Sequence, residues 1–189
     1  KFLYGWKFGG TKLLLSGYPR PGSRIMFHRN IRERVNTVAP FLKLDDDPYV
    51  VLADGQLYWI IDAYTTSSDY PYSESFESGY LADVVRRRSV FSGQAAERKL
   101  QGINYIRNSV KAVVNAYNGD LQLYIFEPDD PVISTWQRTF PDLFKSRGQM
   151  PESLLEHIRY PSDLLQTQGL MYAKYHMTDP TVFYNQEDP

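Results

Sequence analysis

Apolar and polar residues alternate along two stretches of the chain, and a two-residue turn signal lies in the middle of each. The first stretch covers about residues 49–64. Its turn is Asp54-Gly55, because a type I′ turn needs positive φ at both positions. This turn pairs Ala53 with Gln56 and predicts a β-hairpin with one apolar face. That face consists of Val50, Leu52, Leu57, Trp59, Ile61 and Ala63. The opposite face is mixed and holds Tyr49, Val51, Gln56, Tyr58 and Asp62.

The second stretch, about residues 110–127, has the same pattern around Asn118-Gly119. A two-residue turn at this position pairs Val114 with Leu123. The apolar face of this hairpin consists of Val110, Ala112, Val114, Ala116, Leu121, Leu123 and Ile125. Two hairpins with one apolar face each predict a single antiparallel sheet with helices packed on one face, which is an α+β fold.

Helical periodicity flanks the hairpins on both sides. Phe27, Ile31, Val35 and Val38 form one apolar stripe, which predicts a helix from a Ser23 cap to about residue 39. Its other face carries Arg24, Arg29, Arg32 and Arg34. This basic face is either solvated or in contact with an anionic membrane surface. Further helices are predicted after the Asp130 cap, at about residues 151–159, and after Pro161.

Residues 65–101 form a long connection between the hairpins, and we expect it to be mobile. It contains a short predicted helix at about residues 81–87 and the run Arg86-Arg87-Arg88. Such a run either is a solvated surface or binds phosphate or anionic lipid. Residues 1–189 are interpreted as one α+β domain or subdomain. Because the chain starts without methionine, we expect it to be part of a longer protein.

Composition narrows the function classes. The 189 residues carry a net charge of −1, and this balance argues against nucleic acid as a partner. The absence of cysteine excludes disulfides, thiolate chemistry and zinc–sulfur sites. The apolar runs are a few residues long, whereas a membrane-spanning helix needs about 20. The sequence therefore indicates a soluble domain.

No motif in the chain predicts a catalytic, cofactor-binding or metal-binding residue. The contiguous acids Asp45, Asp46 and Asp47 precede a proline and lack the alternating ligands of an EF-hand loop. The three histidines lie far apart in the sequence, although His157 and His176 could meet between helices. A carboxylate pair for glycoside hydrolysis forms in space and so stays open, with these residues as candidates: Asp62, Asp69 and Glu74.

The segment "YTTSSDYPYS", which leaves the first hairpin, is the candidate interaction surface. Aromatic rings and hydroxyls on a loop anchored to a rigid hairpin can hold a glycan or a partner chain. The alternative is that its tyrosines pack on the protein's own sheet. The candidate residues are Tyr64, Thr65, Thr66, Asp69, Tyr70 and Tyr72.

Long strings of this sequence resemble one bacterial family. "RVNTVAPFLKLDDDPYVVLADGQLYWIIDAYTTSSDYPYS", "NYIRNSVKAVVNAYNGDLQLY", "HIRYPSDLLQTQ" and "KYHMTDPTVFYNQEDP" are similar to blocks of uncharacterised protein family number 0182, in the same order. The resemblance implies several membrane-spanning helices upstream and a large soluble region outside the cytoplasm. It implies no catalytic set. The family often has aspartate at the position of Asn115, which argues against an essential acid there.

Two functional hypotheses follow. The first is a non-catalytic, extracytoplasmic interaction or assembly domain of a multi-pass membrane protein. Its partners would be the rest of the parent protein and an envelope glycan or protein. The alternative is a cell-envelope hydrolase or glycan-binding module whose site is completed by parts of the parent outside this chain. The hydrolase reading expects Asp62, Asp69 or His157 to converge in a cleft.

Overall fold

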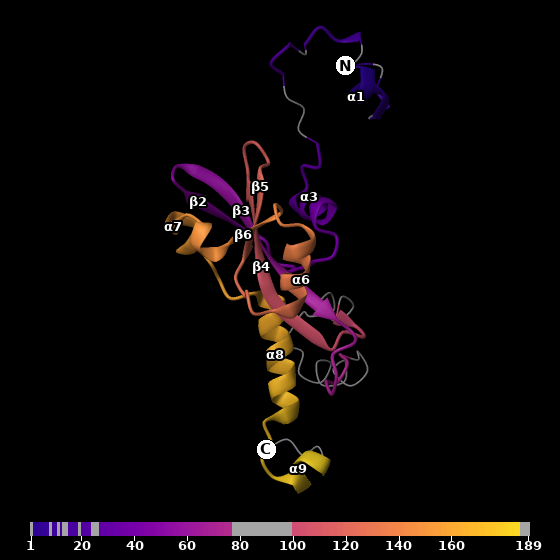
Figure 1. Cartoon of the computed structure of the whole chain (residues 1–189), viewed down its shortest axis with the longest axis vertical. Coiled ribbons are helices and arrows are strands. Elements are labelled where there is room, and N and C mark those ends of the chain that lie inside the picture. The colour runs from indigo at the N-terminus through magenta and orange to yellow at the C-terminus, as the bar shows by residue number, and fades with distance from the viewer. Residues whose placement is uncertain are drawn as a thin grey trace.

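The computed structural model describes residues 2–7, 9–10, 12, 15–18, 20–23, 27–76 and 100–185. Figure 1 shows α1 and α9 at opposite ends of a body built around one sheet. None of the helices in these ranges is both long and apolar enough to cross a bilayer. The elements are α1 (Phe2–Lys7), α3 (Ile31–Val38), β1 (Lys43–Leu44), β2 (Tyr49–Ala53), β3 (Gln56–Ser67), β4 (Tyr105–Asn115), β5 (Leu121–Ile125), α6 (Pro131–Thr139), β6 (Phe144–Ser146), the 3-10 helix η1 (Arg147–Gln149), α7 (Glu152–Leu155), α8 (Ser162–Tyr175) and α9 (Pro180–Asn185).

The sheet has six strands in the order β1-β3-β4-β5-β6, and β2 also pairs with β3. All neighbours are antiparallel except β5 and β6, which are parallel. The 12-residue β3 and the 11-residue β4 form the centre. The predicted α+β class with both hairpins in one sheet is confirmed. The short strands β1 and β6 were not predicted, because two or three residues carry too little alternation to be recognised.

The first hairpin has the predicted register. Ala53 pairs with Gln56, and Val50 pairs with Trp59. Asp54 and Gly55 have φ of 48° and 72°, which are the two positive values that a type I′ turn requires. The turn residues and the pairing rule were therefore sufficient to fix the register of this hairpin.

The apolar face of the first hairpin was assigned correctly near β4 and wrongly at the tip. Ile61 and Ala63 are buried as predicted. Leu52, however, is 63% exposed, and its neighbour Val51 is buried on the opposite side. The reason is that α7 packs beneath the tip on that opposite side, so the face with tyrosine, valine and alanine is the covered one.

The second hairpin has the predicted face with a different register. Val114 pairs with Leu121, two residues from the predicted partner. A shift of two residues keeps every side chain on its face, since the strand period is two. The turn is wider than two residues because the N–H of Gly119 donates to the carbonyl of Asn115 at 2.8 Å. Gly119, at φ 75°, has a positive φ, whereas Asn118 is not among the non-glycine residues with positive φ.

Two apolar cores lie on opposite faces of the sheet. The sequence predicted helices on one face, and the structure has them on both. The first core joins α3 and α6 to the sheet and contains Val35, Ala39, Ile61, Val110, Leu123 and Ile133. The second joins α7 to the other face and contains Tyr49, Val51, Ile60, Val113 and Leu154. Figure 1 shows α6 and α7 on opposite sides of the strands. A continuous run of residues in each of β3 and β4 is therefore buried on both faces.

The N-terminal helix start was predicted too early. The helix α3 begins at Ile31, where the side chain of Asn30 accepts from the N–H groups of Arg32 and Glu33. The hydroxyl of Ser23 instead accepts from the N–H of Arg20 at 2.9 Å. A helix this short leaves Phe27 outside the stripe, while the predicted end before Pro40 is confirmed.

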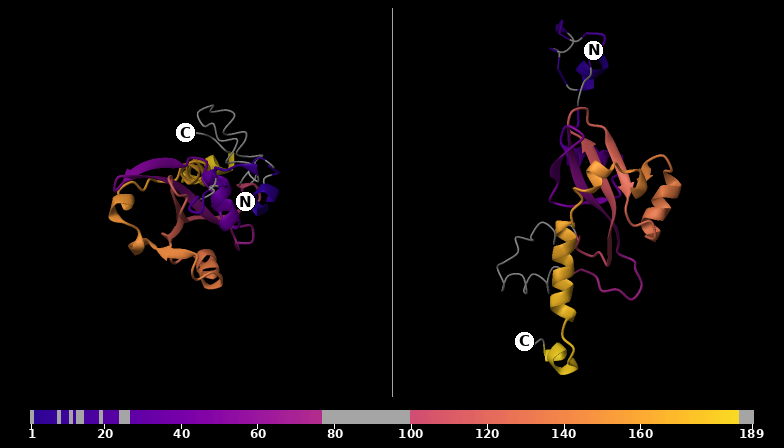
Figure 2. Two further views of the ribbon diagram at one scale, coloured as in Figure 1. Left: turned by 90° about the horizontal axis from the view of Figure 1, so that it is seen from above. Right: turned by 90° about the vertical axis from the view of Figure 1, so that its left-hand side faces the viewer.

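The C-terminal helices follow the predicted order. Asp130 caps α6 and Pro131 occupies its first turn, as predicted. The helix α7 has four residues and is shorter than expected, and α8 starts directly after Pro161. Figure 2 shows α8 running away from the sheet towards α9. The predicted helix at residues 81–87 and the run Arg86-Arg87-Arg88 lie outside the described residues, while β3 continues to Ser67 inside the predicted connection.

Candidate functional site

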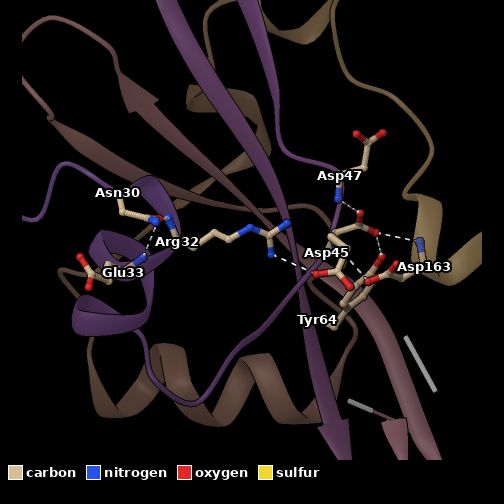
Figure 3. Close-up of polar contacts among 8 residues, drawn as sticks. Asn30, Arg32, Glu33, Asp45, Asp47, Tyr64 and Asp163 are labelled. Atoms are coloured by element: carbon tan, nitrogen blue, oxygen red, sulfur yellow. Dashed lines mark hydrogen bonds and ion pairs between the residues drawn. The ribbon is translucent and has the colours of Figure 1, made fainter. Parts of the chain in front are cut away.

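The aspartate triplet anchors the start of α8 to the sheet (Figure 3). Asp45 is 1% exposed, and its carboxylate accepts a hydrogen bond from the hydroxyl of Tyr64 on β3. The same carboxylate accepts from the N–H of Asp163 at 2.9 Å and from the N–H of Asp47 at 2.8 Å. Burial, followed by the adjacent Asp45 carboxylate, raises the pKa of Tyr64. One buried carboxylate thus joins the turn before β2, the strand β3 and the N-terminus of α8.

Asp46 also connects α8 to the rest of the fold, at the protein surface. Its N–H donates to the carboxylate of Asp163 at 3.1 Å, and its own carboxylate pairs with Arg32 of α3 at 3.2 Å. Within the described ranges, no three histidine or acidic side chains are placed to hold a metal ion together. The triplet is therefore a structural junction in which the carboxylates of Asp45 and Asp46 are already engaged.

The other candidate acids lie apart from one another. Asp62 is buried in the middle of β3 and pairs with Lys111 of β4. The strand continues five residues beyond Asp62 to Ser67, which pairs with Tyr105, and Asn104 holds Tyr70, so Asp69 lies at the far end of β3. Glu74 accepts from the hydroxyl of Tyr175 on α8. The convergence of Asp62 with Asp69 that a hydrolase would need is not formed.

The candidate interaction surface divides into interior and surface residues. Tyr64 and Thr65 are each 1% exposed, so they belong to the core and not to a surface. Thr65 donates to the carboxylate of Asp130 at 2.5 Å. This part of the prediction was wrong because β3 continues through the segment and both of its faces are covered there, so adjacent side chains are both buried.

The rest of that segment is accessible. Asp69, Tyr70 and Tyr72 are exposed, and Thr66 is half-buried. The ring of Tyr70 stacks on Tyr105 with centroids 5.1 Å apart, and its backbone is held by Asn104. The accessible surface is therefore narrowed to Thr66, Asp69, Tyr70 and Tyr72.

A pocket of about 500 Å³ lies where α8 begins beside β4, on the sheet face that α7 covers. Its volume is in the range of small-molecule sites. The wall on the sheet comes from β4 and the residues that follow β5, and the opposite wall comes from η1, the α7–α8 connection and α8. Its apolar surface is formed by Ile106, Phe126, Ile158, Pro161 and Leu164.

Four cationic side chains and one carboxylate line this pocket. The cations are Arg107, Lys111, Arg147 and Arg159, and the carboxylate is Glu127. The guanidinium of Arg147 lies 5.2 Å from the centroid of the Phe126 ring. Within the part of the chain that the structure describes, the three arginines form no ion pair. Three guanidinium groups thus face solvent around a partly apolar pocket.

Arg159 and Lys111 connect the pocket to the core beneath it. The Arg159 guanidinium lies 4.6 Å from the centroid of the Tyr49 ring, and the backbone N–H of Arg159 donates to the Tyr49 hydroxyl at 3.3 Å. Burial raises the pKa of Tyr49 to about 12, so this hydroxyl stays neutral. Lys111 is buried and contacts Asp62 directly. The pocket therefore has a fixed floor and an arginine-rich rim.

Sequence reasoning did not find this pocket. Its four cations are spread over 53 positions, from Arg107 to Arg159, and come from a strand, a 3-10 helix and a connection, so no motif links them. One signal was present, because Asp62 and Lys111 are charged residues that lie between apolar neighbours in the middle of two strands. A buried charge needs a partner, so this signal could have suggested the cross-strand pair, although no prediction was drawn from it.

Comparison with known proteins identifies the family. The family model described as Uncharacterised protein family (UPF0182) matches residues 1–189. A UPF0182 protein of Sulfurovum sp. (strain NBC37-1) is 50% identical over 189 residues, which cover 100% of this chain and 19% of the relative. A UPF0182 protein of Methanospirillum hungatei JF-1 is 47% identical over 188 residues, again 100% of this chain and 19% of the relative.

A third relative, from Trichodesmium erythraeum (strain IMS101), is 45% identical over 189 residues, which cover 100% of this chain and 20% of that protein. The chain thus spans about a fifth of the length of the curated relatives it matches. No solved structure matches it. The full-length family match and the identities of 45–50% confirm the resemblance seen in the sequence blocks, and the chain belongs to the Uncharacterised protein family (UPF0182).

Proposed function

We propose that this chain is a non-catalytic binding domain that holds an acidic glycan in the pocket between β4, η1 and the start of α8. The observation that carries the proposal is the lining of the pocket, in which Arg107, Lys111, Arg147 and Arg159 face one carboxylate, Glu127. The whole chain has a net charge of −1. The positive charge of the pocket is therefore local and does not follow from the overall composition.

The arginines supply the chemistry for an anion. A guanidinium group presents a planar fork of N–H donors that matches the two oxygens of a carboxylate or phosphate. The rings of Phe126 and Tyr49 hold Arg147 and Arg159 by cation–π contact, which limits their freedom before a ligand arrives. The apolar wall formed by Ile158, Pro161 and Leu164 suits the carbon face of a sugar ring.

The arrangement favours binding over hydrolysis. Glycoside hydrolysis generally uses two carboxyl groups about 5–10 Å apart on either side of the bond. The described residues place one carboxylate, Glu127, on the pocket lining. Asp62 lies behind Lys111 and is at least as buried as its partner. A carboxylate in that position compensates the lysine charge and does not reach a substrate.

The proposal extends to the longer protein. Its relatives are about five times as long as this chain, and the family resemblance implies membrane-spanning helices upstream. We place this domain on the outer side of the membrane in such a parent. There the exposed Thr66, Asp69, Tyr70 and Tyr72 would contact the rest of the parent or a second envelope component.

Binding isotherms with matched oligosaccharides test the function. The probes share one sugar backbone and are neutral, uronate-bearing or phosphorylated. We expect the two charged probes to bind, with an affinity that falls as salt rises. The double variant R147Q/R159Q should weaken binding about tenfold or more, because two charge-assisted hydrogen-bonding groups are lost.

The matched control is Arg138→Gln. Arg138 lies on α6, outside the pocket, and donates to Thr135 at 3.3 Å. This variant should bind like the wild type. Equal affinity for the neutral probe, or unchanged binding by R147Q/R159Q, would contradict the proposal. Release of shorter sugars from any probe would contradict its non-catalytic part.

The placement outside the cytoplasm has its own test. The chain contains no cysteine, so a single cysteine at the exposed Tyr117 provides a unique label site in a parent whose other cysteines have been replaced. We expect a membrane-impermeant maleimide to label Tyr117→Cys in intact cells. Labelling only after lysis would place the domain on the cytoplasmic side.

A further inference from the structure

Lys111 lies between the pocket and the buried carboxylate of Asp62. It lines the pocket, yet its side chain is 4% exposed and that of Asp62 is 3% exposed. The two residues are direct cross-strand partners on β4 and β3. The Lys111 ammonium also lies 5.6 Å from the centroid of the Phe126 ring, which is part of the pocket wall. One ammonium group therefore faces both a fixed buried anion and the space that a ligand would occupy.

The groups around Asp62 come from three parts of the fold. Lys111 and Asn108 face it from β4, Asp45 lies after β1, and Tyr49 lies on β2. Burial raises the pKa of Asp62, and the Lys111 charge offsets this only in part. Asp45 adds to the rise, while the Asn108 amide opposes it.

Asn108 also provides an available donor. Its Nδ2 atom is buried on the pocket side of β4, and it has no well-formed hydrogen bond to the residues that the structure describes. Beyond Tyr49, the next charge is the guanidinium of Arg159, which is itself part of the pocket rim. The surroundings of Asp62 and the lining of the pocket are thus one connected electrostatic unit.

We infer that an anion in the pocket and the Asp62 carboxylate share Lys111, so that anion binding and proton uptake by Asp62 favour each other. This inference rests on the proposed function and specifies how the same site is regulated. With Asp62 ionised, its charge neutralises Lys111 and repels a second anion. With Asp62 protonated, the Lys111 charge is directed to the ligand alone.

The sign of the coupling follows from this competition. A bound anion favours the protonated form of Asp62, and protonation of Asp62 favours the bound anion. The pocket therefore binds anions more tightly as pH falls. Coupling between two binding events is reciprocal, so a rise of one unit in the pKa of Asp62 on saturation corresponds to about a tenfold gain in affinity.

Inorganic sulfate is a suitable probe because it keeps its double charge over the range in which a carboxyl group whose pKa lies above the ordinary value takes up its proton. The first measurement is the NMR titration of the Asp62 side-chain carbon in sodium sulfate and in sodium chloride of equal ionic strength. We expect the midpoint to lie higher in sulfate. The second is the Kd for sulfate at several pH values, which we expect to fall severalfold towards acid pH.

Variants separate Asp62 from the other titrating groups. Asp62→Asn should bind sulfate more tightly at pH 7 and lose the pH response. Glu127→Gln removes a negative charge from the lining, and His157→Gln removes a nearby histidine; both should keep the pH response. If Asp62→Asn does not fold, the wild-type titration still decides the question, because it reports Asp62 directly.

The outcomes distinguish this inference from the proposed function. Sulfate binding with the same Asp62 midpoint in both salts, or a pH response that Glu127→Gln abolishes, would overturn the coupling and leave the pocket as a binding site. No sulfate binding at any pH, together with no binding of the acidic oligosaccharides, would overturn both. Binding with a higher Asp62 midpoint in sulfate supports the coupling.

Discussion

The guanidinium of Arg34 lies against the backbone of Gly119, and its Nη1 atom donates to the Gly119 carbonyl at 2.9 Å. Its Nη2 and Nε atoms donate to the carbonyls of Phe27 and His28 at 2.9 Å and 3.2 Å. One side chain of α3 thus fixes the turn between β4 and β5 and the segment before α3. The basic face predicted from the sequence therefore contains an arginine that stabilises the fold and is not free to bind a membrane.

The first prediction concerns Gly119→Ala. Gly119 has a φ of 75°, and an added Cβ would lie 2.8 Å from the central guanidinium carbon of Arg34. Both the backbone conformation and this contact oppose the substitution. We expect the free energy of unfolding, measured in urea, to fall by about 1–3 kcal/mol.

Gly55→Ala is the matched control for that variant. Gly55 has a φ of 72°, and no atom lies within 4 Å of its added Cβ. It should therefore show the conformational part of the loss alone, which we expect to be about 1 kcal/mol. Equal losses in the two variants would mean that the contact between Gly119 and Arg34 contributes nothing.

The second prediction concerns the anchor of α8. Tyr64→Phe removes the hydroxyl that donates to Asp45 and accepts from the N–H of Leu164 at 3.3 Å. Because the Asp45 carboxylate stays buried with one donor fewer, we expect a loss of about 1–3 kcal/mol in unfolding free energy. Tyr58→Phe is the control, since its hydroxyl bonds Gln56 at the surface at 3.3 Å. A similar small loss in both variants would contradict a special role for the Asp45 contact.

The third prediction concerns the acid stability that Asp130 provides. Burial alone would raise the pKa of Asp130, but hydrogen bonds from Ser109, Thr65, Tyr105 and the N–H of Val132 lower it below its usual range. At pH values between the folded pKa of Asp130 and the ordinary aspartate pKa, the unfolded state then binds more protons than the folded state. The stabilisation is therefore present above the ordinary aspartate pKa and is lost as pH falls through the folded value.

Thr65→Val tests this sign. The variant removes one donor to Asp130 and should lower the free energy of unfolding at pH 7 by about 1–2 kcal/mol. The difference from wild type should shrink as the pH falls and Asp130 becomes protonated in both proteins. Comparing the two proteins cancels the titration of other groups, including Asp62. A difference that stays constant down to acid pH would show that Asp130 is not the group involved.

Local chemistry predicted the parts of the fold that short segments determine. Asp54-Gly55 fixed the register of the first hairpin, and Asp130-Pro131 fixed the start of α6. The Asn118-Gly119 signal placed the second turn and missed its width, because Asn115 extends the turn by accepting from the N–H groups of Tyr117 and Asn118. The extra residues depend on a side-chain acceptor that a two-residue turn rule does not consider.

The candidate site could not be predicted in the same way. Arg107 and Arg159 meet at one pocket because β4 and the start of α8 are adjacent, and Asp45 brings them together through the N–H of Asp163. The contact between Asp45 and Asp163 joins residues 118 positions apart. The interior position of Tyr64 was missed for a related reason, since no local pattern marks its partner Asp45 as a buried acceptor.

The last prediction compares two leucines, one from each hairpin. The sequence pattern placed both on faces that cover one core. Leu52 at the tip and Leu123 on β5 were both predicted to be buried, but Leu52 is 63% exposed and Leu123 is 1% exposed. We expect Leu123→Ala to lower the free energy of unfolding by about 2–5 kcal/mol through lost burial and a cavity. Leu52→Ala should change it by no more than about 0.5 kcal/mol. Urea unfolding of both variants measures this contrast. A large loss for Leu52→Ala in the isolated chain would show that the tip is covered, for instance by a second copy, and in that case the loss should vary with protein concentration.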